Sequence, residues 1–302
     1  MCFMRVQKRE NYIKNIYAAL HTLAINCAEC NSDNADGNVV KSVSRKKVRN
    51  KDEYKYYLQL NPNKVVPGDM IRGYSQFMEV VQQVVDLMEI SDFTIGRADM
   101  SFNSDAMEDY DLYSKLNRLI ICCISKYKNI PNCYESRDLW SLRSLSIAIK
   151  NEYLEAENYN KSIEDPNVLA KNRLELRSKR MKLGLVDEFQ YKWVIILDAA
   201  VQEFDSVQER YNEELAKIWN MDIQKPKKER DFVSWTAFVL QFKDCIFTRK
   251  QLRELLELIG VQNPDGAAKR FKDRHQIEFF SKNDLVTVVQ ALKDAMNVYF
   301  SA

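Results

Sequence analysis

Glycine and histidine are scarce in this chain of 302 residues, which has seven Gly and two His. The sequence contains no GxGxxG run and no GxxxxGK[ST] run, so a dinucleotide-binding fold and a Walker-type nucleotide site are disfavoured. His21 and His275 are too far apart in sequence for an HExxH protease motif, a His-rich zinc site or an adjacent His pair on one strand. A metal-dependent activity would therefore need a site made of carboxylates.

An excess of one charge and long apolar runs are also lacking. The chain has 45 Lys and Arg against 43 Asp and Glu, a net charge of +2, so any basic surface must be local. No apolar run approaches the roughly 20 residues of a membrane span, and the apolar start is too short for a signal peptide. The seven cysteines lie mostly in apolar stretches, which is typical of reduced thiols. We expect an ordered, cytoplasmic protein with no membrane partner.

The spacing of apolar residues predicts three regions, and the length allows one large or two to three small domains. Residues 1–53 are predicted to form a helix over Lys8–Ala28 and then a mobile basic arm over Lys41–Lys55, for which a merely solvated linker is the alternative. Residues 54–224 are predicted to form an α+β domain with a mixed or antiparallel sheet and a trailing helix. Its expected strands are Tyr54–Leu60, Asp92–Asn103, Ser144–Lys150, Glu152–Asn160 and Asn172–Lys179, and its expected helices are Ile71–Met88, Asp109–Lys126 and Asp187–Trp219.

One face of this sheet is predicted to carry chemistry. In three of the strands, period-2 geometry puts apolar side chains on one face and charged or tyrosine side chains on the other. If the strands are neighbours, the carboxylates of Asp99, Glu155 or Glu157, and Glu175 can converge and bind Mg²⁺ or Mn²⁺ at about 2.1 Å. The alternative is an ordinary solvated face with cross-strand Glu–Arg pairs. Side chains that could hold or attack a phosphodiester there are Arg97, Tyr153, Tyr159, Lys161, Arg173 and Arg177.

Three short motifs on these strands resemble a known family. They read Arg97-Ala98-Asp99, then Tyr159-Asn160-Lys161, then Asn172-Arg173-Leu174-Glu175-Leu176-Arg177. In content and order they resemble the R-x-D, Y-[DN]-K and N-R-[VLIF]-E-[LI]-R motifs of the rolling-circle replication initiators of Gram-positive plasmids and integrative elements. The resemblance covers about residues 92–179 and places these motifs on the central sheet of a nicking domain.

The resemblance implies an enzyme that nicks and rejoins one DNA strand at an origin. A tyrosine would attack a phosphodiester beside a bound Mg²⁺ or Mn²⁺, leaving a 5′-phosphotyrosine and a free 3′-hydroxyl. Asp99 and Glu175 match the family's strand acids, and the residues that would contact phosphate or orient these acids are Arg97, Lys161, Arg173 and Arg177. The family carries its nucleophile in a Tyr-x-Gly-Ser segment, but Leu145–Lys150 stands at that place without Tyr or Gly. The nucleophile candidates are therefore Tyr153 first, with Tyr159 and Tyr134 behind it.

Two hypotheses about function follow. The first is the nicking initiator, whose implied partner is DNA and which allows a homodimer and a host helicase as further partners. The second is a non-catalytic regulator of a mobile element or phage, which binds DNA or another protein with the same scaffold. Covalent adduct formation distinguishes the two hypotheses, because only the first requires a tyrosine nucleophile.

A break at Lys225–Arg230 precedes the last region, residues 231–302, which is predicted to be winged-helix-like and to bind DNA. Its expected order is a helix with Thr248 as N-cap, a turn, a second helix over Ala267–His275 and a wing strand over Ile277–Phe280. A small helical bundle with solvated charges is the alternative. The basic side chains of the second helix, which would face the major groove, are Lys269, Arg270, Lys272 and Arg274.

Overall fold

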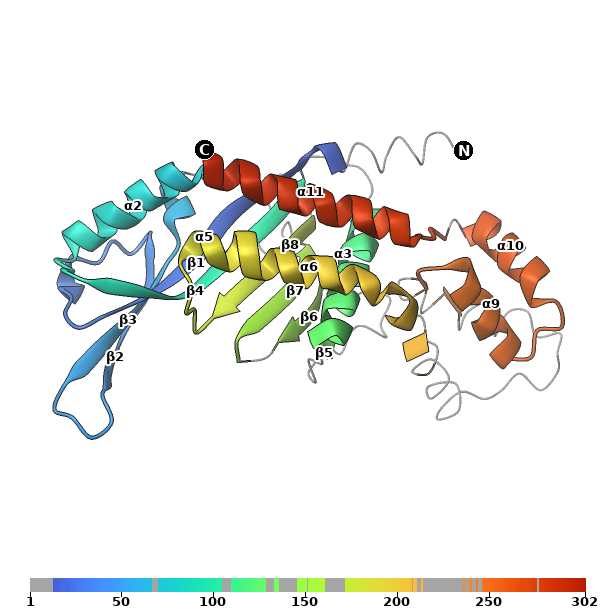
Figure 1. The fold of residues 1–302 in the computed structure, drawn as a ribbon, viewed down its shortest axis with the longest axis horizontal. Coiled ribbons are helices and arrows are strands. Elements are labelled where there is room, and N and C mark those ends of the chain that lie inside the picture. Colours follow the sequence, from blue (N-terminus) through green and yellow to red (C-terminus); the bar gives the residue numbers. More distant parts are fainter. Residues whose placement is uncertain are drawn as a thin grey trace.

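The computed structural model describes residues 13–66, 70–104, 110–128, 133–135, 146–150, 152–160, 172–207, 209–210, 213, 236, 239–240, 243, 246–275 and 277–302. In this part of the chain the fold is α+β, with helices packed on an antiparallel sheet of eight strands (Figure 1). The predicted α+β class with an antiparallel sheet is thereby confirmed. Among the residues described, none of the helices has both the length and the apolar character that crossing a membrane requires.

The strands of the sheet lie between residues 16 and 179. Their bounds are β1 (Ile16–Cys27), β2 (Val40–Lys47), β3 (Tyr54–Leu60), β4 (Phe93–Ser104), β5 (Cys133–Glu135), β6 (Ser146–Lys150), β7 (Leu154–Asn160) and β8 (Asn172–Lys179). The order across the sheet is β2-β3-β1-β4-β8-β7-β6-β5, and all neighbouring pairs are antiparallel. All five strands that are predicted within residues 54–224 are present, as β3, β4, β6, β7 and β8.

Helices cover one face of the sheet. The described helices are α2 (Tyr74–Leu87), α3 (Tyr110–Lys128), α5 (Leu185–Asp187), α6 (Val194–Gln202), α9 (Arg249–Leu258), α10 (Pro264–His275) and α11 (Lys282–Ser301), with a π-helical turn over Glu188–Trp193 and 3-10 turns over Ser32–Asn34 and Pro62–Val65. Figure 1 shows α6 and α11 lying across the same side of the sheet, and α11 contacts both β1 and α6. Trp193 anchors this layer, since its buried indole N–H donates to Ser178 Oγ of β8 at 2.9 Å. Two predicted helices are confirmed as α2 and α3, and a third is confirmed as far as α6.

The predicted helix over Lys8–Ala28 is wrong from Ile16 onward, because this segment is β1, in the sheet between β3 and β4. The reason is a register shift at His21. Leu20 pairs with Met100 and Leu23 pairs with Ala98, so two leucines three residues apart point to the same face. That spacing imitates one side of a helix.

The predicted mobile connection over Lys41–Lys55 is also wrong in form. Residues 40–47 are β2, which pairs with β3 through Arg45↔Tyr56 and Lys47↔Tyr54 and forms an edge of the sheet. Charged and polar side chains are exposed on both faces of β2 beyond Val43, so the alternation that marks a half-buried strand is missing.

The C-terminal region divides by its packing. α9 and α10 share a second, smaller apolar core, whereas α11 belongs to the main core with the sheet. Thr248 is the N-cap of α9, as predicted, and accepts a hydrogen bond from the Gln251 N–H at 3.1 Å. The predicted wing strand over Ile277–Phe280 is not formed, because these residues run as a connection from α10 to the N-cap of α11. The predicted unit 231–302 therefore contributes helices to two different cores.

Candidate functional site

The three motif strands lie side by side, because β4 pairs with β8 and β8 pairs with β7. Apolar side chains of these strands, such as Met100, Leu176 and Ala156, belong to the main core. The charged and tyrosine side chains share the opposite face, as predicted, and we call it the polar face. Its cross-strand rows are Asp99–Arg177–Glu155, Ser101–Glu175–Glu157 and Asn103–Arg173–Tyr159.

Arg177 is at the centre of the polar face. Its Nη2 lies 2.7 Å from Glu157 Oε2 and 2.5 Å from Glu175 Oε2, while its Nη1 pairs with Glu155. Its Nε lies 3.7 Å from Asp99 Oδ2. A guanidinium has five N–H donors in one plane, so a single arginine can serve several carboxylates at once. The acidic side chains that the sequence predicts to converge are thus brought together, and the cation between them is an arginine.

Asp99 and Glu157 are the less firmly ionised members of the cluster. Asp99 receives two hydrogen bonds from Arg97, at 2.7 and 2.6 Å, which lower its pKa, as does Arg177. Burial, and after it the charge of Glu175, nevertheless raises this pKa above its usual value. Burial likewise raises the pKa of Glu157; Arg177 opposes this rise and the charge of Glu175 adds to it. In both carboxyl groups the neighbouring arginines favour the charged form, and desolvation opposes it.

Glu175 is firmly ionised. Burial alone would raise its pKa, but Arg177, His21 and Arg173 together lower it to about 2. The Tyr159 hydroxyl donates a hydrogen bond to Glu175 Oε1 at 2.6 Å. Burial, and after it the charge of Glu175, raises the pKa of Tyr159, so this phenol keeps its proton. Tyr159 therefore acts in this structure as a buried donor to a carboxylate.

Arg173 is enclosed at the far row of the polar face. Its Nε donates to Asn103 Oδ1 at 2.8 Å, and its Nη1 lies 3.7 Å from Glu175 Oε1. The sulfur of Met70 lies 3.5 Å from its Nη2 and covers this end. Of the arginines predicted to contact phosphate on this face, Arg173 is buried, whereas 34% of the Arg97 side chain is exposed.

The predicted metal ligands do not fit a divalent cation in this arrangement. Oxygen donors of the right chemistry are present in Asp99, Glu157 and Glu175, but Arg177 contacts all three and holds the place between them. Among the described residues, no group of three or more His, Cys, Asp or Glu is arranged to hold a metal ion. The geometry shows a neutralised cluster, in which four carboxylates face four basic side chains: Arg97, Arg173, Arg177 and Lys179.

Tyr153 lies at the edge of the polar face and is 45% exposed. Its backbone carbonyl accepts from the Lys179 N–H at 2.7 Å, next to the first row. A hydrogen bond to Glu152 raises the pKa of Tyr153, and Glu152 in turn pairs with Arg180 at 2.7 Å. The structure therefore gives Tyr153 an accessible hydroxyl with a carboxylate beside it. Lys161, which was predicted to accompany it, lies outside the described residues.

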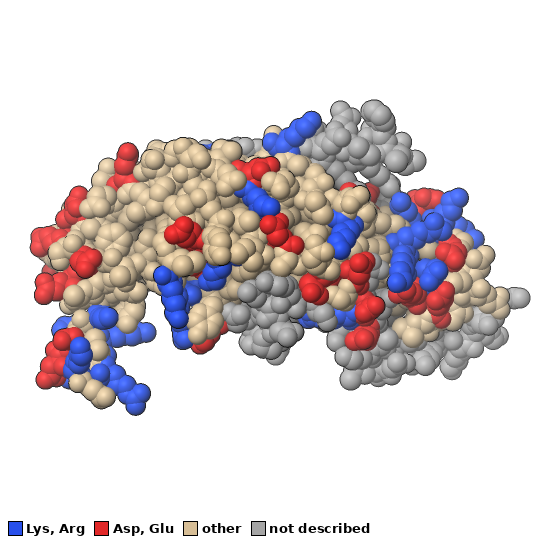
Figure 2. Space-filling model, viewed as in Figure 1, with Lys and Arg blue, Asp and Glu red and all other residues tan. Residues whose placement is uncertain are grey.

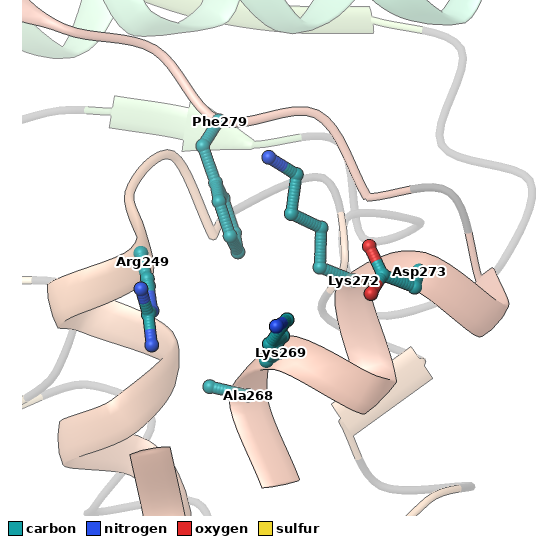
Figure 3. Close-up of a pocket in the computed structure, with 6 residues that line it drawn as sticks. All are labelled: Arg249, Ala268, Lys269, Lys272, Asp273 and Phe279. Carbon is teal, nitrogen blue, oxygen red and sulfur yellow. The ribbon is translucent and has the colours of Figure 1, made fainter. Parts of the chain in front are cut away.

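The basic side chains predicted on the second C-terminal helix are present on α10, away from the polar face. Lys269, Arg270 and Arg274 are exposed, and Lys272 is half-buried with its Nζ 5.3 Å from the centre of the Phe279 ring. A surface pocket of about 370 Å³ lies between α9 and α10 (Figure 3). The side chains that line this pocket, three of them cationic and one acidic, are Arg249, Ala268, Lys269, Lys272, Asp273 and Phe279.

Several interactions of the polar face could not be predicted from the sequence. His21 was considered only as a zinc ligand, but its charge lowers the pKa of Glu175 from the bulge in β1. Period-2 geometry places Lys179 on the charged face of its strand, but it does not predict the ion pair that Lys179 forms with Glu155. Glu152 and Arg180 precede and follow their strands, where alternation carries no signal.

The sequence matches no protein-family model, and a search of curated proteins finds no match. What supports a function is therefore the chemistry of the polar face, of α10 and of the β2–β3 hairpin.

Replacing Tyr159 with phenylalanine is expected to lower the free energy of unfolding by about 1.5–3 kcal/mol, because a buried hydrogen bond to a charged acceptor is lost. The pKa of Glu175 should rise with it. Denaturant unfolding measures the change, and Tyr153→Phe is the matched control, since an exposed hydroxyl should contribute less than about 0.5 kcal/mol. Equal stability of the Tyr159→Phe variant and the unaltered chain would contradict this role.

Proposed function

We propose that this chain is a DNA-binding protein of the replication-initiator kind, acting at an origin of a plasmid, an integrative element or a phage. The observation that supports it is the placement of the resemblance motifs. Residues of all three motifs, from Asp99 in β4, Tyr159 in β7 and Glu175 in β8, meet in neighbouring rows of one sheet face.

In this proposal α9 and α10 are the part that reads duplex DNA. The two helices are joined by a short turn in the order of a helix-turn-helix, and α10 would enter the major groove. Lys269, Arg270 and Arg274 are exposed for phosphate contacts, and the pocket beside Arg249 is suited to an anionic group. The unit is helix-turn-helix-like, with an extended connection where a wing strand is predicted.

Strand cleavage by the same protein is a second candidate, and Tyr153 favours it. Its exposed hydroxyl has Glu152 as a proton acceptor, and Arg180 is a cation beside it. The phenolic oxygen would lose its proton to Glu152 and bond to phosphorus, while the 3′ oxygen leaves and takes a proton from water. The divalent cation that the resemblance implies could join the carboxylates only where Arg177 moves away.

Binding without cleavage is favoured by the state of the carboxylates. Asp99, Glu157 and Glu175 are each already in contact with Arg177, and Asp99 is also held by two bonds from Arg97. A cluster whose carboxylates are already paired with arginine leaves no donor set open for a cation. The regulator that binds DNA is therefore the form of the proposal that the geometry supports best.

Both forms of the proposal, binding alone and binding with strand cleavage, are tested on the full chain in the presence of Mn²⁺. The substrate is a supercoiled plasmid that carries the DNA flanking the coding sequence of this protein. We expect tighter binding to this DNA than to a scrambled plasmid of equal length. A relaxed product with a covalent adduct that Tyr153→Phe removes, while the exposed Tyr191→Phe control retains it, would establish cleavage. Binding with neither product nor adduct would establish the regulator, and equal binding to both plasmids would contradict the proposal.

A further inference from the structure

The β2–β3 hairpin projects from the body of the protein. β3 pairs with β1 only over residues 56–60. Tyr54 and Lys55 of β3 therefore pair only with β2, and they form with it a two-stranded ribbon outside the rest of the sheet. Figure 1 shows this ribbon extending away from the helices and the rest of the sheet. We call residues 41–57, which include the ribbon and its turn, the basic arm.

Positive charge is concentrated on the basic arm. Its seventeen residues contain seven Lys and Arg but only two acidic residues, Asp52 and Glu53, whereas the whole chain has a net charge of only +2. Without the arm, the remainder of the chain would be net acidic. Figure 2 shows Lys and Arg side chains gathered on this projection. Such a local cluster creates a field that attracts a polyanion.

Tyrosines alternate with the cations on both faces of the arm. On one face Arg45 lies over the Tyr54 ring at 3.7 Å from its centre, and on the other Lys46 lies 5.2 Å from the centre of Tyr57. Tyr54 and Tyr57 are both exposed. These contacts hold flexible cationic side chains beside flat rings, so less side-chain entropy is lost when a partner binds.

The arm is ordered by its own bonds. Val48 N–H donates to Glu53 C=O at 2.8 Å across the turn, and Lys47 Nζ pairs with Asp52 at 2.8 Å. The tip, Val48–Glu53, has no bulky aromatic or long aliphatic side chain to insert into lipid. A pre-formed, cationic two-stranded ribbon has the width that the major groove of B-DNA admits.

We propose that the basic arm lies in a groove of duplex DNA, with Arg45, Lys46 and Lys55 on the phosphates. This rests on the proposed function in that the partner is DNA, and it names the surface and the duplex form. The arm continues the polar face, because Gln59 of β3 pairs with Ala24 of β1, which pairs with Arg97. A duplex held by the arm would pass beside the exposed edge of that face.

The test compares two triple variants of the full chain by fluorescence anisotropy on a labelled duplex carrying a site that the unaltered chain binds, over a series of salt concentrations. One variant has Arg45→Gln, Lys46→Gln and Lys55→Gln, which keeps the Lys47–Asp52 pair in the turn. The control has Lys14→Gln, Lys64→Gln and Lys182→Gln, three exposed charges outside the arm. Unchanged circular dichroism and melting temperature verify that both variants fold.

We expect the arm variant to bind at least about tenfold more weakly, and its slope of log K against log salt to fall by about 2 to 3, close to 0.9 per lost phosphate contact. The control should bind like the unaltered chain. Equal loss in both variants, or no loss in the arm variant, would overturn the arm's role and leave the proposed function standing. An unaltered chain that binds no duplex would overturn both, and arm-dependent binding to anionic phospholipid vesicles without duplex binding would overturn the choice of DNA.

Discussion

Replacing Arg177 with alanine is expected to lower the free energy of unfolding by about 3–5 kcal/mol, the cost of removing one partner from a buried ion pair. The Arg177 side chain is 15% exposed and contacts four carboxylates, while Asp99 and Glu175 are almost fully buried. Without the guanidinium these acids would repel one another in a region with little water. Denaturant unfolding at neutral pH measures the loss.

The same variant should remove the loss of stability that Glu175 causes in acid and should favour stabilisation at lower pH. In the unaltered chain the folded-state pKa of Glu175 is lowered to about 2, so its contribution is present above the unfolded value near 4.5 and is lost as pH falls toward 2. In Arg177→Ala, Glu157 and Glu175 lose their main counter-charge, so their pKa values should lie above those of the unfolded chain. Lowering the pH from about 7 to 5 should then stabilise the variant, because protons bind the folded form more tightly.

Arg180→Ala is the matched control, three residues further along the chain. Arg180 forms an exposed pair with Glu152, which should contribute no more than about 1 kcal/mol. Should Arg177→Ala fail to fold, Arg177→Lys keeps the charge but loses the planar fork that serves several carboxylates, and should still be clearly destabilised. A loss below about 1 kcal/mol in both Arg177 variants would show that the cluster does not depend on this residue.

The central sheet could be predicted because its strands have two unlike faces. β4, β7 and β8 alternate apolar and polar residues, so their bounds and the shared polar face follow from period-2 geometry alone. β1 could not be predicted in the same way. Ala19 and Leu20 are both fully buried on opposite faces, and the bulge at His21 then repeats the apolar phase after three residues.

The strand form of the basic arm and the place of Arg177 in the ion cluster could not be predicted, for different reasons. A ribbon that leaves the sheet has no core to face, so β2 beyond Val43 carries exposed polar and charged side chains on both sides and resembles a linker. β3 is predicted as a strand, because Leu58 and Leu60 return to the core. In the cluster, alternation places Arg177 on the same face as Glu175, but it cannot show whether a guanidinium points inward among the acids or outward to a ligand. That choice depends on distances between side chains of three strands, which only the folded register fixes.

Manganese is expected to stabilise the Arg177→Ala variant and to leave the unaltered chain unchanged. Removing the guanidinium leaves the carboxylates of Asp99, Glu157 and Glu175 around the place that it held, and such oxygen donors suit Mn²⁺. At a concentration about 100 times the dissociation constant, a bound ion adds roughly 2.7 kcal/mol, a rise of several degrees in melting temperature. Thermal unfolding with and without MnCl₂ measures it.

The double variant Arg177→Ala, Glu175→Gln is the control, because it lacks the central carboxylate and should lose most of the manganese effect. An equal rise in the unaltered chain would show that Arg177 yields its place to a cation, which would favour strand cleavage over binding alone. No rise in any variant would show that the three carboxylates do not form a cation site even when they are unpaired. The outcome thus separates an acidic cluster built around an arginine from a metal site that an arginine occupies.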